Sequence, residues 1–195
     1  MKIKEKDELG IQLSTTKMKM EINRFAAIDF ETADYGRDSA CSISIVIAEK
    51  GKIVKTSSFL IRPPRRDFIF SYLHGITWRD VAKKPDFIEL WPKINKFLNK
   101  VDFIAAHNAS FDHGVLHACC TVAGIVPPNI KYLCTMKLAR CLWGLYPTRL
   151  PDVCRHFGIP LKHHNAESDA VACAKIVIRA LEERIPKNAF LGKNK

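Results

Sequence analysis

The sequence of 195 residues has no long hydrophobic run, since no apolar stretch approaches the ~20 residues that a membrane-spanning helix needs. Its N-terminus, M-K-I-K-E-K-D-E-L-G, lacks the apolar core of a secretion signal. Hydrophobic residues make up 47% and charged residues 26%, the balance of an ordinary globular protein. We therefore expect a cytoplasmic protein that has no membrane partner.

Cysteine is present, but its pattern does not favour a disulfide framework. The seven cysteines are an odd number and most lie in apolar segments, which favours reduced, structural thiols. A zinc site is an alternative, because two histidines and two cysteines lie close together at His113, His117, Cys119 and Cys120. No C-x-x-C pair supports a closed tetrahedral site there.

Acidic residues are missing from the whole segment 113–151, which carries Lys131, Lys137, Arg140 and Arg149. A second basic cluster lies at 62–66, R-P-P-R-R, near Arg79, Lys83 and Lys84. Over the chain 31 Lys and Arg exceed 20 Asp and Glu, so the formal net charge is +11. Such an excess favours a polyanionic partner, nucleic acid above all.

Periodicity predicts one α/β domain at residues 23–186, between a flexible N-terminal extension at 1–22 and a basic tail at 187–195. Patterns of period two predict strands near 24–30, 39–49 and 53–62, with the last two forming an antiparallel hairpin around E-K-G-K. Further short strands are expected at 101–106 and 130–134. Helices are expected at 86–99, 110–124, 135–143, 150–157 and 165–184.

The helix at 86–99 has an N-terminal capping pair in Asp86 and Glu89, while Pro92 predicts a kink or a later start. As a crossover connection, this helix places the strand at 101–106 beside the first strand and parallel to it. The result is an α/β domain with a mixed sheet.

Two acids, Asp29 and Glu31, end the first strand in A-I-D-F-E-T. Side chains two positions apart on a strand point to the same side. Two carboxylates projecting together from an apolar sheet call for a positive partner, and hard divalent cations prefer carboxylate oxygen. An edge strand that presents both acids to water is the simpler alternative.

Three further polar residues begin two of the predicted helices. Asp112 lies in the first turn of the helix that follows the fourth strand, so parallel strands bring it to the edge where Asp29 and Glu31 lie. Asp169 lies in the first turn of the last helix, and His164 just precedes that helix. Taken one at a time, Asp112 and Asp169 could simply interact favourably with the positive end of a helix dipole, and His164 could be an exposed loop residue.

Together, the segments A-I-D-F-E-T, H-N-A-S-F-D and H-N-A-E-S-D-A resemble the three motifs of the DEDDh 3′–5′ exonucleases. That family includes the proofreading ε subunit of bacterial replicative polymerase, ribonuclease T and oligoribonuclease. H-G-I-T at 74–77 and C-T at 134–135 are also similar to family features, and the resemblance covers about residues 24–183. It implies a ribonuclease H-like, three-layer α/β/α fold whose five-stranded mixed sheet has the order 3-2-1-4-5 with strand 2 antiparallel.

The resemblance also implies residue roles. Four acids would bind two divalent ions, Mg²⁺ with Mn²⁺ as a substitute, namely Asp29, Glu31, Asp112 and Asp169. His164 would be the general base, although the adjacent His163 stays an alternative. Four residues would contact the terminal nucleotide, namely Thr32, His107, Asn108 and Phe111. For these, strand continuation by Thr32, helix capping by Asn108 and core packing by Phe111 are equally good interpretations.

The function implied is a metal-dependent 3′–5′ exonuclease that releases 5′-mononucleotides from single-stranded 3′ ends of DNA or RNA. We expect a DNA proofreading or repair type with a polymerase or repair partner, either a free-standing nuclease or a small repair accessory. The alternatives are an idle nucleic-acid- or polymerase-binding module on the same fold, an RNA-directed exonuclease like ribonuclease T, or a metal-binding structural protein.

Overall fold

The computed structural model describes residues 22–183. The predicted N-terminal extension, apart from its last residue, and the predicted basic tail lie outside these residues. Within the described part of the chain, no helix combines the length and the apolar character that crossing a bilayer requires.

The centre of the fold is a five-stranded sheet of order β3-β2-β1-β4-β5. Its strands are β1 (Arg24–Thr32), β2 (Ala40–Glu49), β3 (Lys52–Leu60), β4 (Ile104–Ala106) and β5 (Tyr132–Cys134). The pairs β1–β2 and β2–β3 are antiparallel, while β1–β4 and β4–β5 are parallel. This confirms the predicted strand order and the parallel placement of the fourth strand.

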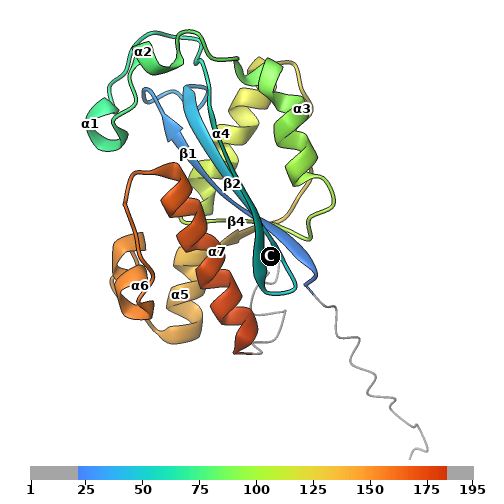
Figure 1. Ribbon diagram of the computed structural model, residues 1–195, viewed down its shortest axis with the longest axis vertical. Coiled ribbons are helices and arrows are strands. Elements are labelled where there is room, and N and C mark those ends of the chain that lie inside the picture. The colour runs from blue at the N-terminus through green and yellow to red at the C-terminus, as the bar shows by residue number, and fades with distance from the viewer. Residues whose placement is uncertain (1–21, 184–195) are drawn as a thin grey trace, which may run out of the picture.

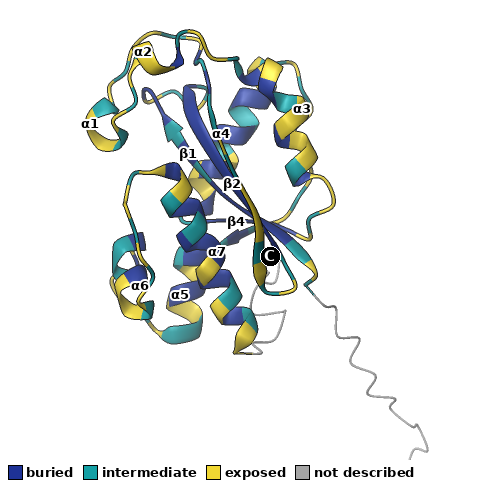
Figure 2. Cartoon of the chain, viewed as in Figure 1, coloured by how far each residue is buried: buried dark blue, intermediate teal, exposed yellow. Residues whose placement is uncertain are grey.

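Helices cover both faces of the sheet (Figure 1). On one face α3 (Phe87–Leu98) and α4 (Ala109–Val122) enclose a core with β1 and β2. On the other, α5 (Thr135–Trp143), α6 (Leu150–Phe157) and α7 (Ala166–Glu182) enclose a second core. Buried residues lie where the helices meet the sheet (Figure 2). The three-layer α/β/α prediction is therefore confirmed.

Strand β1 lies between β2 and β4, and both of its faces are buried because α3 and α4 cover one of them and α7 the other. Ala26, Ile28 and Phe30 point into the core under α3 and α4, whereas Phe25 and Ala27 point into the core under α7. The period of two places Asp29 and Glu31 on the α7 side. The alternative of an edge strand with two acids facing water is wrong.

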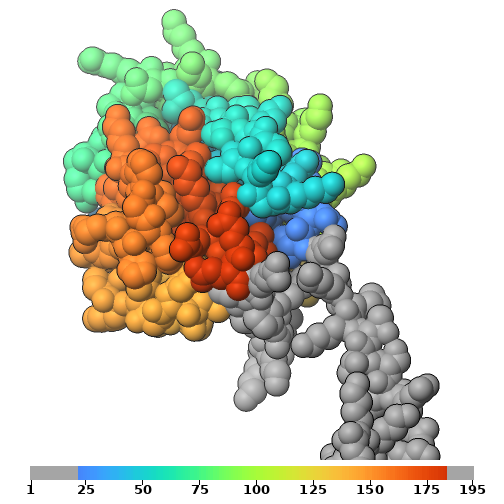
Figure 3. All heavy atoms as spheres, turned by 60° about the horizontal axis from the view of Figure 1, so that its bottom comes forward, coloured from blue at the N-terminus to red at the C-terminus, as the bar shows by residue number. Residues whose placement is uncertain are grey.

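Helix α7 packs across β1, β2 and β3. In Figure 3 it is seen in red beside the hairpin residues in cyan. Its start is fixed by Asn165, whose side chain accepts a hydrogen bond from the Ser168 N–H. This cap sets the position of the first turn, which carries Asp169.

Two differences from the sequence-based prediction concern helices. The one-turn helices α1 (Ser71–His74) and α2 (Trp78–Val81) were not predicted, because four residues are too few to establish a helical period. A later start of α3 at Pro92 is wrong: the helix begins at Phe87, and the capping box of Asp86 and Glu89 is fully formed. That box and a buried apolar face outweigh the one backbone hydrogen bond that Pro92 removes.

Candidate active site

A cavity of about 310 Å³ opens at the carboxyl end of β1. It lies where the end of β1, the segment that contains α1, the first turn of α4 and the start of α7 meet. Its lining comprises Asp29, Phe30, Glu31, Thr32, Phe70, Leu73, His74, Phe111, His163, His164 and Asp169. The structure thus brings three of the four predicted metal-binding acids to one surface.

Asp29 is the acid on which the other three converge. Burial raises its pKa well above the ordinary value, and the negative charges of Asp112, Glu31 and Asp169 raise it further. Burial and the charge of Asp169 likewise raise the pKa of Glu31 to about 7. A proton on one carboxyl or a cation between them would relieve this repulsion.

The fourth acid, Asp112, is not among the lining residues and is only 1% exposed. Its Oδ1 accepts a hydrogen bond from the Phe30 N–H at 3.1 Å, which ties the first turn of α4 to β1. Burial raises its pKa to about 8, although the bond from Phe30 acts in the opposite direction. Asp112 is therefore a buried carboxyl whose negative charge acts on Asp29.

Asp169 joins the two adjacent histidines to the site. Its Oδ2 accepts a hydrogen bond from the His164 N–H at 3.1 Å and lies 2.9 Å from His163 Nδ1. Its Oδ1 is buried and has no hydrogen-bond partner within the described residues. Burial raises its pKa, against the opposing influence of His163.

His164 lines the cavity from a left-handed backbone conformation, with φ of +64°. Its ring stacks on that of His163 at 3.9 Å between centroids. Burial and the neighbouring His163 lower the pKa of His164, so at neutral pH its imidazole is uncharged and can accept a proton. The ring bonded to Asp169 is that of His163, which the sequence alone ranked second.

The four predicted nucleotide contacts divide into two pairs. Thr32 and Phe111 line the cavity. His107 does not, because its ring nitrogens lie 2.9 Å from Thr135 Oγ1 and 2.9 Å from the Thr148 carbonyl oxygen. Burial lowers its pKa to about 4, so His107 is uncharged at neutral pH. Its two hydrogen bonds connect the end of β4 to the start of α5 and to the residue that precedes Arg149.

Asn108 also lies outside the cavity lining. It is exposed, has a left-handed backbone conformation and accepts a hydrogen bond from Ser110 Oγ. Although it occupies the residue before α4, its side chain makes no capping hydrogen bond to that helix.

Phe70, Leu73 and His74 are cavity residues that the sequence analysis did not name as site residues. His74 Nδ1 accepts a hydrogen bond from the Ile76 N–H, so its Nε2 donates to the Thr32 carbonyl oxygen 3.2 Å away. The H-G-I-T segment was the only signal for His74, and it gave no role to the side chain.

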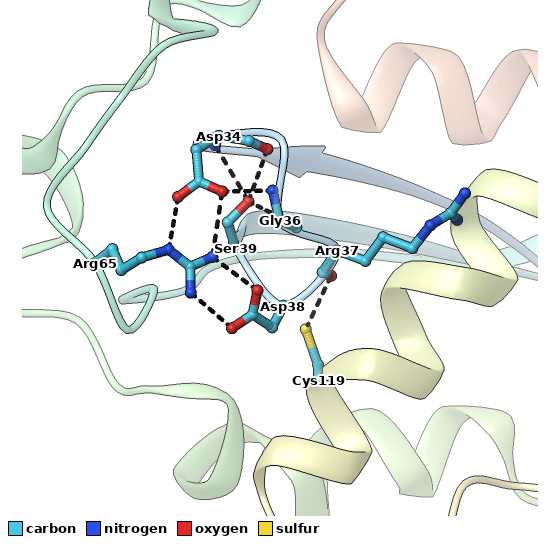
Figure 4. A network of polar contacts seen from close by, with 7 residues as sticks. All are labelled: Asp34, Gly36, Arg37, Asp38, Ser39, Arg65 and Cys119. Carbon is cyan, nitrogen blue, oxygen red and sulfur yellow. Dashed lines mark hydrogen bonds and ion pairs between the residues drawn. The ribbon is translucent and has the colours of Figure 1, made fainter.

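A polar network holds the loop at 33–39 that follows β1 (Figure 4). The Arg65 guanidinium donates two hydrogen bonds to Asp34, at 2.9 and 3.2 Å, and two to Asp38, at 2.8 and 2.7 Å. The hydrogen bonds from Arg65 lower the pKa of both carboxyls. Gly36 lets the guanidinium approach closely, since a Cβ there would lie 2.4 Å from Arg65 Nη2 and the side chain would have to move.

This loop positions one wall of the cavity. The Ala33 carbonyl oxygen accepts hydrogen bonds from the Ile69 and Phe70 N–H groups at 2.7 and 3.2 Å. The exposed ring of Tyr35 packs edge-on against Phe70 at 4.9 Å. Arg65 does not line the cavity, but it holds the loop whose residues Ala33 and Tyr35 contact Phe70.

The four acids suit a pair of hard divalent cations. Residues 22–183 contain no ready-made group of three His, Cys, Asp or Glu ligands around one point. The acids nevertheless raise one another's pKa, and the buried Asp169 Oδ1 lacks a partner. An array of carboxylate oxygens with unrelieved repulsion is the donor set that Mg²⁺ and Mn²⁺ take.

Comparison with known proteins finds exonucleases by family model, by sequence and by structure. The family model described as "Exonuclease" matches residues 26–177. Exodeoxyribonuclease 10 of Escherichia coli K12 is 34% identical over 162 residues, which are 77% of this chain and 66% of that protein. A structure of exonuclease X in complex with 5′ overhanging duplex DNA covers 86% of this chain and 97% of its own, at 26% identity and a TM-score of 0.70.

The PolC-type DNA polymerase III of Thermotoga maritima is 32% identical over 162 residues, 81% of this chain. The chain spans only 12% of the length of that polymerase, so it corresponds to one segment of the larger protein.

The acids should make stability depend on pH when divalent cations are removed. Because folding raises the pKa of Glu31 to about 7 and of Asp112 to about 8, their contribution is complete below their unfolded pKa near 4 and is lost as pH rises through 7 and 8. In EDTA, the Tm should fall between about pH 5 and 9 by on the order of 5–10 °C. At about pH 9, Mg²⁺ in excess over EDTA should raise the Tm again.

Asp112→Asn is the matched control, because its amide cannot ionise and should flatten this decline in a thermal scan. An equally steep decline in the variant would contradict the assignment of the effect to the acid cluster.

Loss of the Arg65 side chain should leave the carboxylate of Asp34, whose side chain is only 11% exposed, without its partner. We expect Arg65→Ala to lower the free energy of unfolding by about 1–3 kcal/mol, measured by urea denaturation. Arg66→Ala, whose guanidinium only lies over the Trp78 ring, is the neighbouring control and should cost less. Equal stability of the two variants would show that the network does not hold the loop.

Proposed function

Because this chain belongs to the exonuclease family, we propose that it is a metal-dependent 3′–5′ exonuclease of the DEDDh type. It would hydrolyse phosphodiester bonds at single-stranded 3′ ends and release 5′-mononucleotides. The observation that carries the proposal is the convergence of Glu31, Asp112 and Asp169 on the half-buried carboxyl of Asp29.

Asp29, Glu31, Asp112 and Asp169 would hold two divalent cations, Mg²⁺ or Mn²⁺. When bound, such a pair supplies charge neutralisation at phosphorus, activation of water and stabilisation of the leaving 3′ oxygen. The buried carboxylates keep these charges in a site of low dielectric, where each interaction with the phosphate is stronger than in water.

His164 would be the general base that takes a proton from the attacking water. Its lowered pKa keeps the imidazole unprotonated at neutral pH, which is the form that a base needs. The hydrogen bond from its backbone N–H to Asp169 fixes the base relative to one of the acids. His163, engaged with Asp169 through Nδ1, would orient that carboxylate.

The terminal nucleotide would lie in the cavity between Phe70, Leu73 and Phe111. A volume of about 310 Å³ is at the small end of ligand sites and suits one nucleotide rather than a duplex. Phe111 is 37% exposed and offers a ring face on which a base can stack without sequence preference.

We favour DNA as the substrate, in proofreading or repair with a polymerase or repair partner. The similarity to Exodeoxyribonuclease 10 and to a segment of a PolC-type DNA polymerase supports this choice.

The direct test uses 5′-labelled single-stranded DNA and RNA of matched sequence, incubated with Mg²⁺, Mn²⁺ or EDTA. We expect a ladder of products shortened from the 3′ end, faster on DNA and absent in EDTA. Asp29→Asn keeps the size of the side chain but removes its charge, so the rate should fall on the order of 10³-fold or more. Undiminished hydrolysis by this variant would refute the site, and a faster RNA ladder would reverse the choice of DNA.

The two histidines can be separated kinetically. His164→Ala should lower the single-turnover rate by ~10²–10⁴-fold at saturating Mg²⁺, with little change in the affinity for the ion. His163→Ala should lose less, because this ring contacts Asp169 rather than the attacking water. A larger loss in His163→Ala than in His164→Ala would exchange their roles.

A further inference from the structure

A second concave surface lies on the α3 side of the sheet, away from the carboxyl end of β1 where the candidate active site opens. It is a groove of about 470 Å³ between the β2–β3 hairpin and α3. We call it the lysine groove, after Lys55, Lys93 and Lys96, which line it together with Phe59 and Phe97. Phe59 and Phe97 pack against the core under α3 and α4, whereas Asp29 and Glu31 lie on the α7 side.

The lysine groove carries a net positive charge. Its one acid, Glu49, is already paired with Arg24. Within residues 22–183, none of the three lysines forms an ion pair with a carboxylate. Three exposed ammonium groups on the rim of one groove, without counter-charges, suit a ligand with several negative charges in a row.

The floor of the groove is aromatic. The rings of Phe59 and Phe97 are 6.1 Å apart and tilted by 56°, and both are only partly buried. Lys55 Nζ lies 5.1 Å from the centre of the Phe97 ring. Interleaved aromatic rings and cations are the combination that binds single-stranded nucleic acid, because bases stack on the rings while phosphates meet the cations. An acidic protein segment would use the lysines but not the rings.

The groove lies within reach of a strand whose 3′ end occupies the cavity. Phe30, which lines that cavity, pairs with Ile43, and Ile43 pairs with Phe59. Two strand spacings, or ~10 Å, therefore separate Phe59 from the cavity across the sheet, while Lys55, which pairs with Ile47, lies a further ~13 Å along the hairpin. The hairpin strand β3 is at the edge of the sheet, so a flexible single strand can pass around it to the α3 side.

We propose that the lysine groove is a second nucleic-acid site, which binds single-stranded substrate several nucleotides upstream of the 3′ end. This inference deepens the proposed function and rests on it. The groove would contribute to the binding of long strands and would not affect a substrate too short to leave the cavity.

The test compares a 5′-fluorescein oligo-dT of about 20 nucleotides with one of about four, by anisotropy in EDTA over a range of salt. In the triple variant Lys55→Gln, Lys93→Gln, Lys96→Gln, the long strand should bind at least ~10-fold more weakly at low salt. The slope of log K against log salt should become shallower by about 2, since each neutralised phosphate of a single strand contributes ~0.7. The short strand should bind as before.

The matched control removes three charges elsewhere: Lys100→Gln, Lys131→Gln, Lys175→Gln, which are exposed and line neither cavity. Phe97→Leu tests the floor, and it should weaken long-strand binding without changing the salt slope. An equal effect of both triple variants would overturn the proposal in favour of overall charge. Displacement of the long strand by poly-glutamate as efficiently as by unlabelled oligo-dT would overturn it in favour of an acidic protein segment.

Hydrolysis of the four-nucleotide substrate keeps the two proposals apart. If the groove variant hydrolyses it at the wild-type rate and binds the long strand normally, the groove proposal fails while the nuclease proposal stands. If the wild type does not hydrolyse it with Mg²⁺, the nuclease proposal fails, whatever the groove binds.

Discussion

Repulsion among buried carboxylates is the constraint around which this molecule is organised. Four acids from three distant segments meet at the carboxyl end of β1, where burial alone makes their charged forms costly. Helix dipoles and backbone hydrogen bonds lower that cost for two of the acids. Asp112 and Asp169 lie in the first turns of α4 and α7, at the positive ends of two helix dipoles, and each accepts a backbone hydrogen bond. A cation bound among the four acids would relieve the repulsion that remains.

The sheet explains why these acids can meet at all. Helices cover both faces of the central strand β1, so the alternation of the backbone decides which core each of its side chains enters. The parallel neighbour β4 then delivers α4 to the same edge, and the cap at Asn165 starts α7 there as well. The site therefore depends on the register of the sheet, because a shift of β1 by one residue would turn Asp29 into the opposite core.

Local patterns in the sequence were sufficient for the β2–β3 hairpin, for the parallel pairing of β1 with β4 and for the meeting of Asp29, Glu31 and Asp112, whereas the full strand order came from the family resemblance. Period-two patterns and the capping pair at Asp86 and Glu89 are local signals, and the crossover helix α3 then places β4 beside β1. The side-chain partners could not be obtained in that way. Arg65 meets Asp34 across 31 positions, and His107 meets the Thr148 carbonyl oxygen across 41, with no local signature for either contact. Nor does the sequence indicate that the ring of His163 and the backbone N–H of His164 both meet Asp169 Oδ2.

The two outer strands of the sheet have a bearing on solubility. Unpaired backbone groups on an edge strand are a template on which identical chains can add, and proteins often block such edges with lysine or with very short strands. Here β3 carries Lys52 and Lys55, while β5 at the other end is only three residues long. The lysines of β3 and the short length of β5 leave little edge on which another chain could add a strand. Both ends of the sheet are thereby protected from fibril-like self-association.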